Sequence, residues 1–145
     1  MYRVLVPVDG DETRADTQVS TIESLPSMEA EMEVHVLHVY EELSIPADEA
    51  GRTPIESVNE SLEAYRELPD GVRNVIAALE GAGIDPVVHE LVADPAEAIC
   101  STAEEIDADM ILMGVRDRTP IGKVVLGSVS QQVIHRSEIP VLIAR

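Results

Sequence analysis

Short apolar segments and longer segments with a helical pattern alternate along this chain. The short segments are runs of Val, Ile and Leu, which are typical of strands covered on both faces of a parallel sheet. In the longer segments apolar residues recur every three or four positions, which predicts amphipathic helices. The predicted strands are residues 3–8, 34–40, 87–92, 110–113 and 140–144, and the predicted helices are residues 15–25, 55–79, 96–106 and 128–136.

Proline and turn residues predict where some of these elements begin or end. Pro69 predicts a kink or a break in the long pattern over 55–79, because proline disrupts the helix that precedes it. Asp94 and Pro95 form an N-cap followed by proline at the first helical position. Residues 41–53 are polar and contain proline and glycine, so we expect a mobile loop there.

The order of these elements predicts the fold class. Strands and helices alternate as βαβαβαβαβ, which implies a parallel sheet with right-handed crossovers and helices on both faces. For five strands the usual arrangement is an open, doubly wound α/β sheet. A chain of 145 residues is long enough to form one core, so we assign residues 1–145 to a single domain.

A glycine-rich connection, residues 113–129, joins the fourth predicted strand to the last predicted helix. Such connections bind phosphates, because glycine lets backbone N–H groups approach an anion and the helix start contributes unpaired N–H donors. Arg116, Arg118 and Lys123, three of the ten basic residues in the chain, fall within it. The segment is a candidate anion site, although such a charge cluster also fits a surface loop paired with carboxylates.

The spacing within this connection resembles a known motif. Gly114, two residues, Asp117, nine residues and Gly127-Ser128 are similar to the Gly-x2-Gly-x9-Gly-Ser/Thr motif of the universal stress protein family, with Asp117 in place of the second glycine. The resemblance extends to Val-Pro-Val-Asp-Gly at 6–10 and Ile-Pro-Val-Leu-Ile at 139–143. It therefore covers the whole chain as one domain.

The resemblance implies an adenine-nucleotide alpha hydrolase-like fold with strand order 3-2-1-4-5, whose winding reverses between the first and fourth strands, where ligands bind. It also implies that Asp9 contacts a ribose and that adenine lies near Val39, although Asp9 by its position also fits an Asx turn. The ligand is then ATP or another adenine nucleotide, and whether Mg²⁺ or Mn²⁺ accompanies it stays open. The nucleotide-binding residues implied by the resemblance are Pro7, Val8, Asp9, Val39, Met113, Gly114, Arg116, Asp117, Gly127, Ser128 and Val129.

Two functions fit these residues. The first is a stress-response regulatory protein that binds an adenine nucleotide and hydrolyses it slowly at most, since no Walker lysine motif and no positioned base can be recognised. The second is a dimeric protein-interaction module of the same family that binds no nucleotide. Asp117 favours the second function, because a carboxylate repels phosphates. Gly114, Gly127 and Ser128 keep the motif's spacing and favour the first, which we prefer, with no catalytic residue assigned.

The net charge of −18 excludes a general affinity for nucleic acid, whose phosphates the chain would repel. The acidity resembles that of proteins from extreme halophiles, in which a carboxylate-rich surface stays soluble while molar salt shortens the Debye length to about 3 Å. In dilute buffer the same surface repels itself and destabilises the fold. We therefore expect the melting temperature to rise steeply between about 0.1 and 2 M KCl, and an unchanged value would contradict the halophilic interpretation.

Location and partners follow from the same patterns. No apolar run is long enough to span a membrane and no signal-peptide pattern precedes the first strand, so we expect a cytoplasmic protein that does not enter membranes. Strand order 3-2-1-4-5 places residues 140–144 at a sheet edge, and their apolar character predicts a homodimer through this strand. A regulatory protein partner also fits the family. The four histidines and Cys100 show no pattern of metal ligands.

Overall fold

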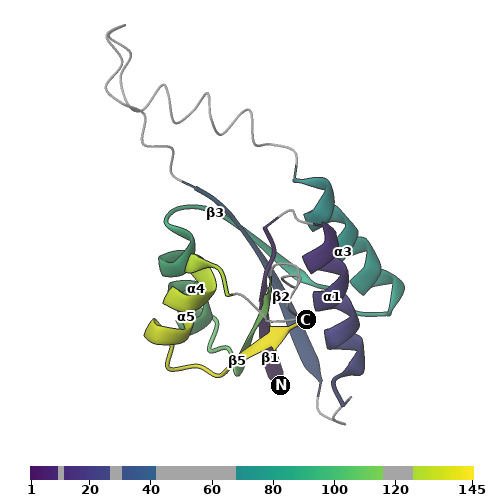
Figure 1. The fold of residues 1–145 in the computed structure, drawn as a ribbon. Helices are drawn as coiled ribbons and strands as arrows, with labels where there is room; N and C mark the ends of the chain where they lie inside the picture. The colour runs from purple at the N-terminus through teal and green to yellow at the C-terminus, as the bar shows by residue number, and fades with distance from the viewer. Residues whose placement is uncertain (10–11, 27–30, 42–67, 116–125) are drawn as a thin grey trace, which may run out of the picture.

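The computed structural model describes residues 1–9, 12–26, 31–41, 68–115 and 126–145 (Figure 1). Five strands in this part of the chain form one parallel sheet in the order β3-β2-β1-β4-β5, which confirms the predicted open, doubly wound α/β fold. The elements are β1 (Tyr2–Pro7), α1 (Glu12–Ser24), β2 (Met32–Tyr40), α3 (Asp70–Gly81), β3 (Val87–Val92), α4 (Pro95–Glu105), β4 (Met110–Gly114), α5 (Ser128–Arg136) and β5 (Val141–Ala144).

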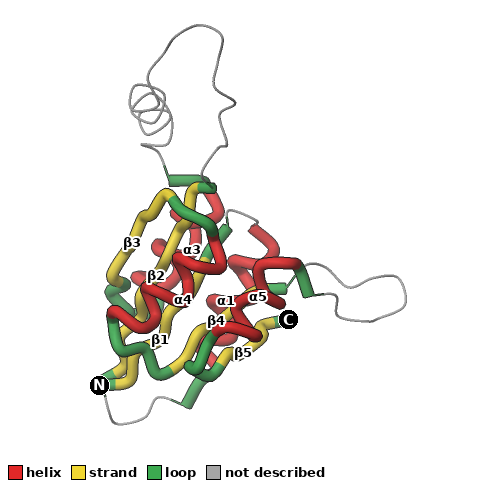
Figure 2. The backbone as a smooth tube through the Cα atoms, turned by 90° about the vertical axis from the view of Figure 1, so that its left-hand side faces the viewer, coloured by secondary structure: helices red, strands yellow, loops and turns green. Residues whose placement is uncertain are grey.

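Helices cover both faces of the sheet. α1 and α3 pack together on one face, and α4 and α5 pack together on the other (Figure 1, Figure 2). Successive side chains of a strand point to opposite faces, so the continuous apolar runs fill two cores. Val4 and Val36 belong to the core under α1 and α3, whereas Leu5 and Leu37 belong to the core under α4 and α5. In the described ranges, the helices are too short or too polar to cross a membrane.

Two predicted boundaries that depend on proline are confirmed. α4 begins at Pro95, and the Asp94 carboxylate caps it by accepting a hydrogen bond from the Glu97 N–H at 3.1 Å. α3 begins after Pro69, whose ψ of 148° is extended, so the helix cannot continue back through it. The predicted helical residues before Leu68, and the predicted loop beyond Glu41, lie outside the described residues.

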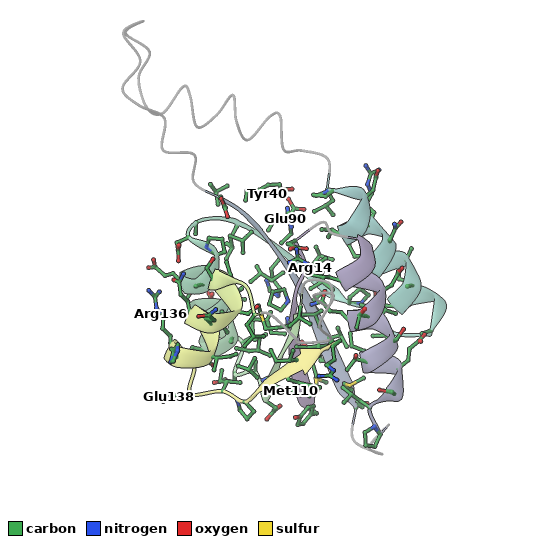
Figure 3. All side chains as sticks on the ribbon, viewed as in Figure 1. Arg14, Tyr40, Glu90, Met110, Arg136 and Glu138 are labelled. Carbon is green, nitrogen blue, oxygen red and sulfur yellow. The ribbon has the colours of Figure 1, made fainter. Side chains whose placement is uncertain are left out.

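Because the strands are parallel, their carboxyl ends all lie along the same side of the sheet, which we call the carboxyl edge. Figure 3 shows Met110, the first residue of β4, at one edge and Tyr40, the last residue of β2, at the opposite edge. Glu90, near the end of β3, lies beside Tyr40 at this carboxyl edge. Doubly wound sheets bind their ligands beyond the carboxyl ends of their strands, so a functional site is expected there.

Two histidines join β2 to the edge strand β3. His35 Nδ1 lies 2.8 Å from His89 Nε2, and the two rings stack with centroids 5.1 Å apart. His35 Nε2 lies 2.6 Å from Glu33 Oε1. A hydrogen bond between two ring nitrogens needs one donor and one acceptor, so only one of the two facing nitrogens carries a proton. Burial, and then the charge of His35, lower the pKa of His89, while Glu105 opposes them.

We expect this histidine pair to make stability depend on pH. Because the pKa of His89 is lowered in the folded protein, the unfolded chain binds more protons than the folded chain between that pKa and the ordinary value of 6.5. The free energy of unfolding should therefore decrease as the pH falls below 6.5. Urea unfolding in molar KCl from about pH 7.5 to about pH 5.5 should show a larger decrease in wild type than in His89→Gln. Equal pH slopes for the two proteins would contradict this expectation.

Candidate functional site

A pocket opens at the carboxyl edge between β1 and β4. Nine of the residues predicted to bind a nucleotide line it, although they come from four separate parts of the chain. The other two, Arg116 and Asp117, lie outside the described residues. The lining consists of Pro7, Val8, Asp9, Arg14, Gln18, Leu37, Val39, Glu41, Pro95, Ile99, Met113, Gly114, Gly127, Ser128, Val129 and Ser130.

The pocket lies where β1 and β4 separate. These strands pair only at Val4 with Met110 and at Leu5 with Ile111. Beyond these pairs β1 continues along β2, while β4 continues along β5. The winding of the sheet reverses at this point, which leaves a crevice between the carboxyl ends of the two strands. The predicted place of the site, between the first and fourth strands, is therefore also the place of the pocket.

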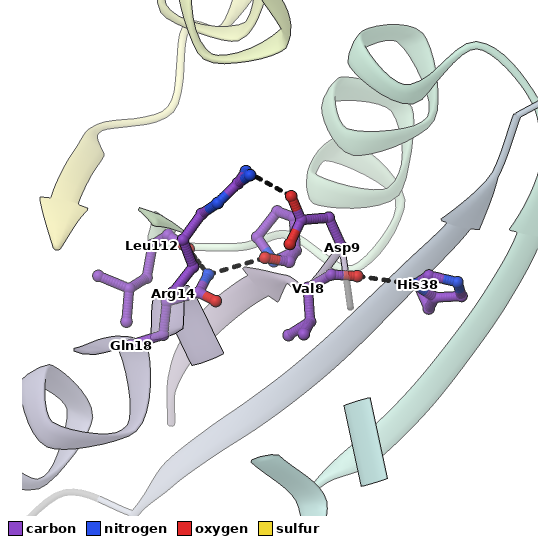
Figure 4. A network of polar contacts seen from close by, with 7 residues as sticks. Val8, Asp9, Arg14, Gln18, His38 and Leu112 are labelled. Atoms are coloured by element: carbon purple, nitrogen blue, oxygen red, sulfur yellow. Dashed lines mark hydrogen bonds and ion pairs between the residues drawn. The ribbon is translucent and has the colours of Figure 1, made fainter. Parts of the chain in front are cut away.

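Gln18 of α1 fills the gap between the two diverging strands (Figure 4). Its Nε2 amide donates to the Pro7 carbonyl at 2.7 Å and to the Leu112 carbonyl at 3.1 Å. The residue is only 1% exposed, so the two carbonyls satisfy a buried amide. The sequence-based prediction missed Gln18. Its signal is a polar residue on the apolar stripe of α1, between Ala15 and Val19.

His38 and Leu37 of β2 form hydrogen bonds with Val8, the residue that follows β1. The Val8 N–H donates to the Leu37 carbonyl at 2.8 Å, and the Val8 carbonyl oxygen lies 2.7 Å from His38 Nδ1 (Figure 4). Because a carbonyl can only accept, Nδ1 carries the proton of this hydrogen bond. The sequence-based prediction assigned His38 no role in the site.

Asp9, the predicted ribose ligand, forms an ion pair with Arg14 from the first turn of α1 (Figure 4). The pair joins Asp9 Oδ2 to Arg14 Nη1, and the Asp9 side chain stays 53% exposed. A carboxylate offers about four acceptor positions, so Asp9 can accept ribose hydroxyls while it remains paired. Arg14, which the sequence-based prediction also missed, offsets one negative charge beside a pocket that would receive an anion.

The two motif glycines have different surroundings. A Cβ atom at Gly114 would lie 3.1 Å from Arg14 Cβ and 3.3 Å from Gln18 Cδ, which is tighter than ordinary packing. Gly114 therefore allows the close approach of α1 to β4, a packing role that differs from the phosphate role suggested by its sequence. A Cβ atom at Gly127 would meet no described atom within 4 Å, and its φ of −66° suits any residue. Neither packing nor backbone conformation within the described residues explains Gly127.

The start of α5 borders the pocket. Gly127 is its N-cap residue and has no side chain to cap the helix, and the first turn holds no acidic residue. In contrast, α4 is capped by Asp94 and has Glu97 in its first turn. The first N–H groups of a helix have no partner within it and carry the positive end of the helix dipole. Because residues 127–130 line the pocket, this helix start can bind an anion there.

Metal and thiol chemistry receive no support from the described part of the chain. Its His, Cys, Asp and Glu side chains form no group of three or more that could hold a metal ion. Cys100 is a half-buried free cysteine on α4, and burial raises the pKa of its thiol. A raised pKa disfavours the reactive thiolate, which agrees with the predicted packing role.

Comparison with known proteins identifies the family. The sequence profile of the universal stress protein family matches residues 1–145. The chain belongs to the universal stress protein family. The predicted family is thus confirmed. Universal stress protein MJ0577 of Methanocaldococcus jannaschii is 29% identical over 157 residues, which cover 100% of this chain and 96% of that protein.

Solved structures of universal stress proteins share the fold. The structure of hypothetical protein MJ0577 is 30% identical with a TM-score of 0.74, and the match covers 99% of this chain and 94% of that chain. The universal stress protein from Archaeoglobus fulgidus in complex with dAMP is 24% identical with a TM-score of 0.59, and the match covers 100% of this chain and 98% of that chain. The arrangement of the sheet and helices is therefore that of the family.

Proposed function

We propose that this universal stress protein is a stress-response regulatory protein that binds an adenine nucleotide, with ATP as the expected ligand, in the crevice between β1 and β4. The start of α5 carries the proposal. This helix N-terminus lines the pocket, and its N-cap residue Gly127 provides no side-chain cap. A Cβ atom at Gly127 would meet no described atom within 4 Å, so there is open space beside it. A phosphate would fill that space and accept hydrogen bonds from the helix N–H groups. The dAMP complex of the Archaeoglobus protein supports an adenine nucleotide as the class of ligand.

In this proposal the phosphates, the ribose and the adenine each contact different residues of the pocket. The phosphates bind the backbone N–H groups of residues 127–129, the ribose hydroxyls donate to Asp9, and adenine lies beside Val39. The family motif assigns Arg116 and Asp117, which lie outside the described residues, to phosphate binding. A Mg²⁺ or Mn²⁺ ion would be held mainly by the phosphate oxygens, because such ions are commonly bound through substrate phosphates and one or two carboxylates.

A second candidate function is a dimeric protein-interaction module that binds no nucleotide. Asp117 is the observation that favours it, because this carboxylate stands where the family motif has a glycine. At that position it would add bulk and a like charge near a polyphosphate. Arg116 and Arg118 flank Asp117 and can offset this charge, so we prefer the nucleotide-binding function.

Purification in molar KCl followed by calorimetric titration separates the two functions. We expect an adenine nucleotide to co-purify with the protein and, after its removal, ATP to bind at one site per chain. Mass spectrometry of the released small molecules identifies the nucleotide. A protein that is folded by circular dichroism, yet binds none of ATP, ADP, AMP and cAMP, would favour the second function.

We also propose that the protein is a homodimer through β5. This strand lies at a sheet edge, where its outer N–H and C=O groups can pair with a second copy. It begins at Val141, one residue later than predicted, because Pro140 has no N–H to donate. Light scattering in molar KCl should give twice the chain mass of 15.7 kDa. A monomer at micromolar concentration would contradict this proposal.

A further inference from the structure

The His38 side chain points away from its two neighbours in β2, which line the pocket. Its neighbours in β2, Leu37 and Val39, line the pocket, and side chains alternate between the two faces along a strand. The His38 ring therefore lies on the face that α1 and α3 cover, where it meets the Tyr40 ring edge-on at a centroid distance of 4.5 Å. It is 6% exposed. His38 itself is not among the residues that line the pocket.

The His38 ring nevertheless acts on the pocket wall through one hydrogen bond. Its Nδ1 lies 2.7 Å from the Val8 carbonyl oxygen (Figure 4). That carbonyl belongs to the planar peptide unit between Val8 and Asp9, so its direction also sets the position of the Asp9 Cα atom. The Val8 N–H donates to the Leu37 carbonyl at 2.8 Å. The N–H and C=O groups of Val8 thus both form hydrogen bonds with β2, and Asp9 is the next residue in the chain.

We infer that His38 is a positioning residue of the nucleotide site, which sets the position of the Asp9 backbone, and so the place of its carboxylate, relative to Val39. The inference rests on the proposed function, in which Asp9 binds the ribose and Val39 lies beside adenine. Because His38 and Val39 are adjacent in β2, the hydrogen bond from His38 fixes the backbone of Asp9 relative to Val39, and the ion pair with Arg14 then orients the carboxylate. When the distance between the two subsites is fixed before the nucleotide binds, less conformational entropy is lost on binding.

A ligand that lacks the ribose hydroxyls distinguishes this role from a merely structural one. A histidine that only satisfied a buried carbonyl would affect every nucleotide alike. 2′,3′-Dideoxy-ATP keeps adenine and the triphosphate but lacks the two hydroxyls that Asp9 would bind. The ratio of its dissociation constant to that of ATP therefore reports on the Asp9 contact, and we expect wild type to prefer ATP by about tenfold.

Three substitutions at His38 test the inference with this ratio. His38→Leu removes the donor and should bring the two dissociation constants close together. His38→Asn places an amide N–H near the position of Nδ1 and should restore the preference for ATP, whereas His38→Gln places its amide near that of Nε2 and should not. In an Asp9→Ala background, His38→Leu should change the ratio no further, because the two residues act through one contact.

Calorimetric titration in molar KCl measures both ligands, and circular dichroism verifies that each variant is folded. If wild type binds neither ligand, the proposed function fails. If wild type prefers ATP and His38→Leu keeps that preference, this inference is overturned while the proposed function stands. His38→Gln replaces His38→Leu in this comparison if the leucine variant does not fold. If His38→Asn and His38→Gln each raise the dissociation constants of ATP and 2′,3′-dideoxy-ATP by the same factor, His38 has a structural role only. That result also overturns the inference.

Discussion

Gly127→Asp is expected to abolish ATP binding while making the protein more stable. At Gly127, the N-cap of α5, φ and ψ are −66° and 168°, an extended conformation in which aspartate accepts hydrogen bonds from N–H groups of the first turn. These are the groups that the proposed phosphates use. The carboxylate would therefore stabilise the helix by about 0.5–1 kcal/mol and at the same time occupy the anion site and repel ATP. Calorimetric titration and urea unfolding in molar KCl measure the two effects.

Gly81→Asp is the matched control for this substitution. Gly81 ends α3, and a Cβ atom there would also meet no described atom within 4 Å, so the variant adds the same charge in equally open space. It is not part of the pocket lining, and its ATP affinity should equal that of wild type. If Gly127→Asp binds ATP as tightly as Gly81→Asp does, the assignment of phosphates to the start of α5 is wrong.

Gly114→Val is expected to cost about 1–3 kcal/mol of unfolding free energy, because the core would be overpacked. The first added carbon alone would lie 3.1 Å from Arg14 Cβ and 3.3 Å from Gln18 Cδ. Relieving these contacts moves α1 away from β4 and stretches the two hydrogen bonds that Gln18 donates across the crevice. The midpoint of urea unfolding in molar KCl should shift to lower denaturant concentration.

Gly127→Val places the same side chain at the other motif glycine, where a Cβ atom meets no described neighbour within 4 Å. Its stability loss should be smaller, about 1 kcal/mol or less from a poor N-cap residue, although ATP binding should be lost. The pair therefore separates a glycine needed for packing from a glycine needed for a ligand. Equal unfolding midpoints for Gly114→Val and wild type would contradict the packing role of Gly114.

The sequence by itself determined the elements and their order. The apolar runs at 3–8 and 110–113 are too continuous for half-exposed strands, and Pro69 and Asp94-Pro95 mark helix starts through local chemistry. Such signals lie within a few residues of the element that they describe. The family resemblance supplied the strand order, and a known order places the carboxyl ends of β1 and β4 side by side. Nine of the predicted site residues therefore lie together at one pocket.

The tertiary structure alone decided which polar groups meet. Gln18 bonds to Leu112, 94 positions away, and His38 bonds to Val8, 30 positions away. No local pattern encodes such partners, because they depend on how far two strands diverge and how closely a helix approaches them. The same holds for the glycines of the motif, which look alike in the sequence. Only the packed chain shows that α1 presses against Gly114 and that the space beside Gly127 is open within the described residues.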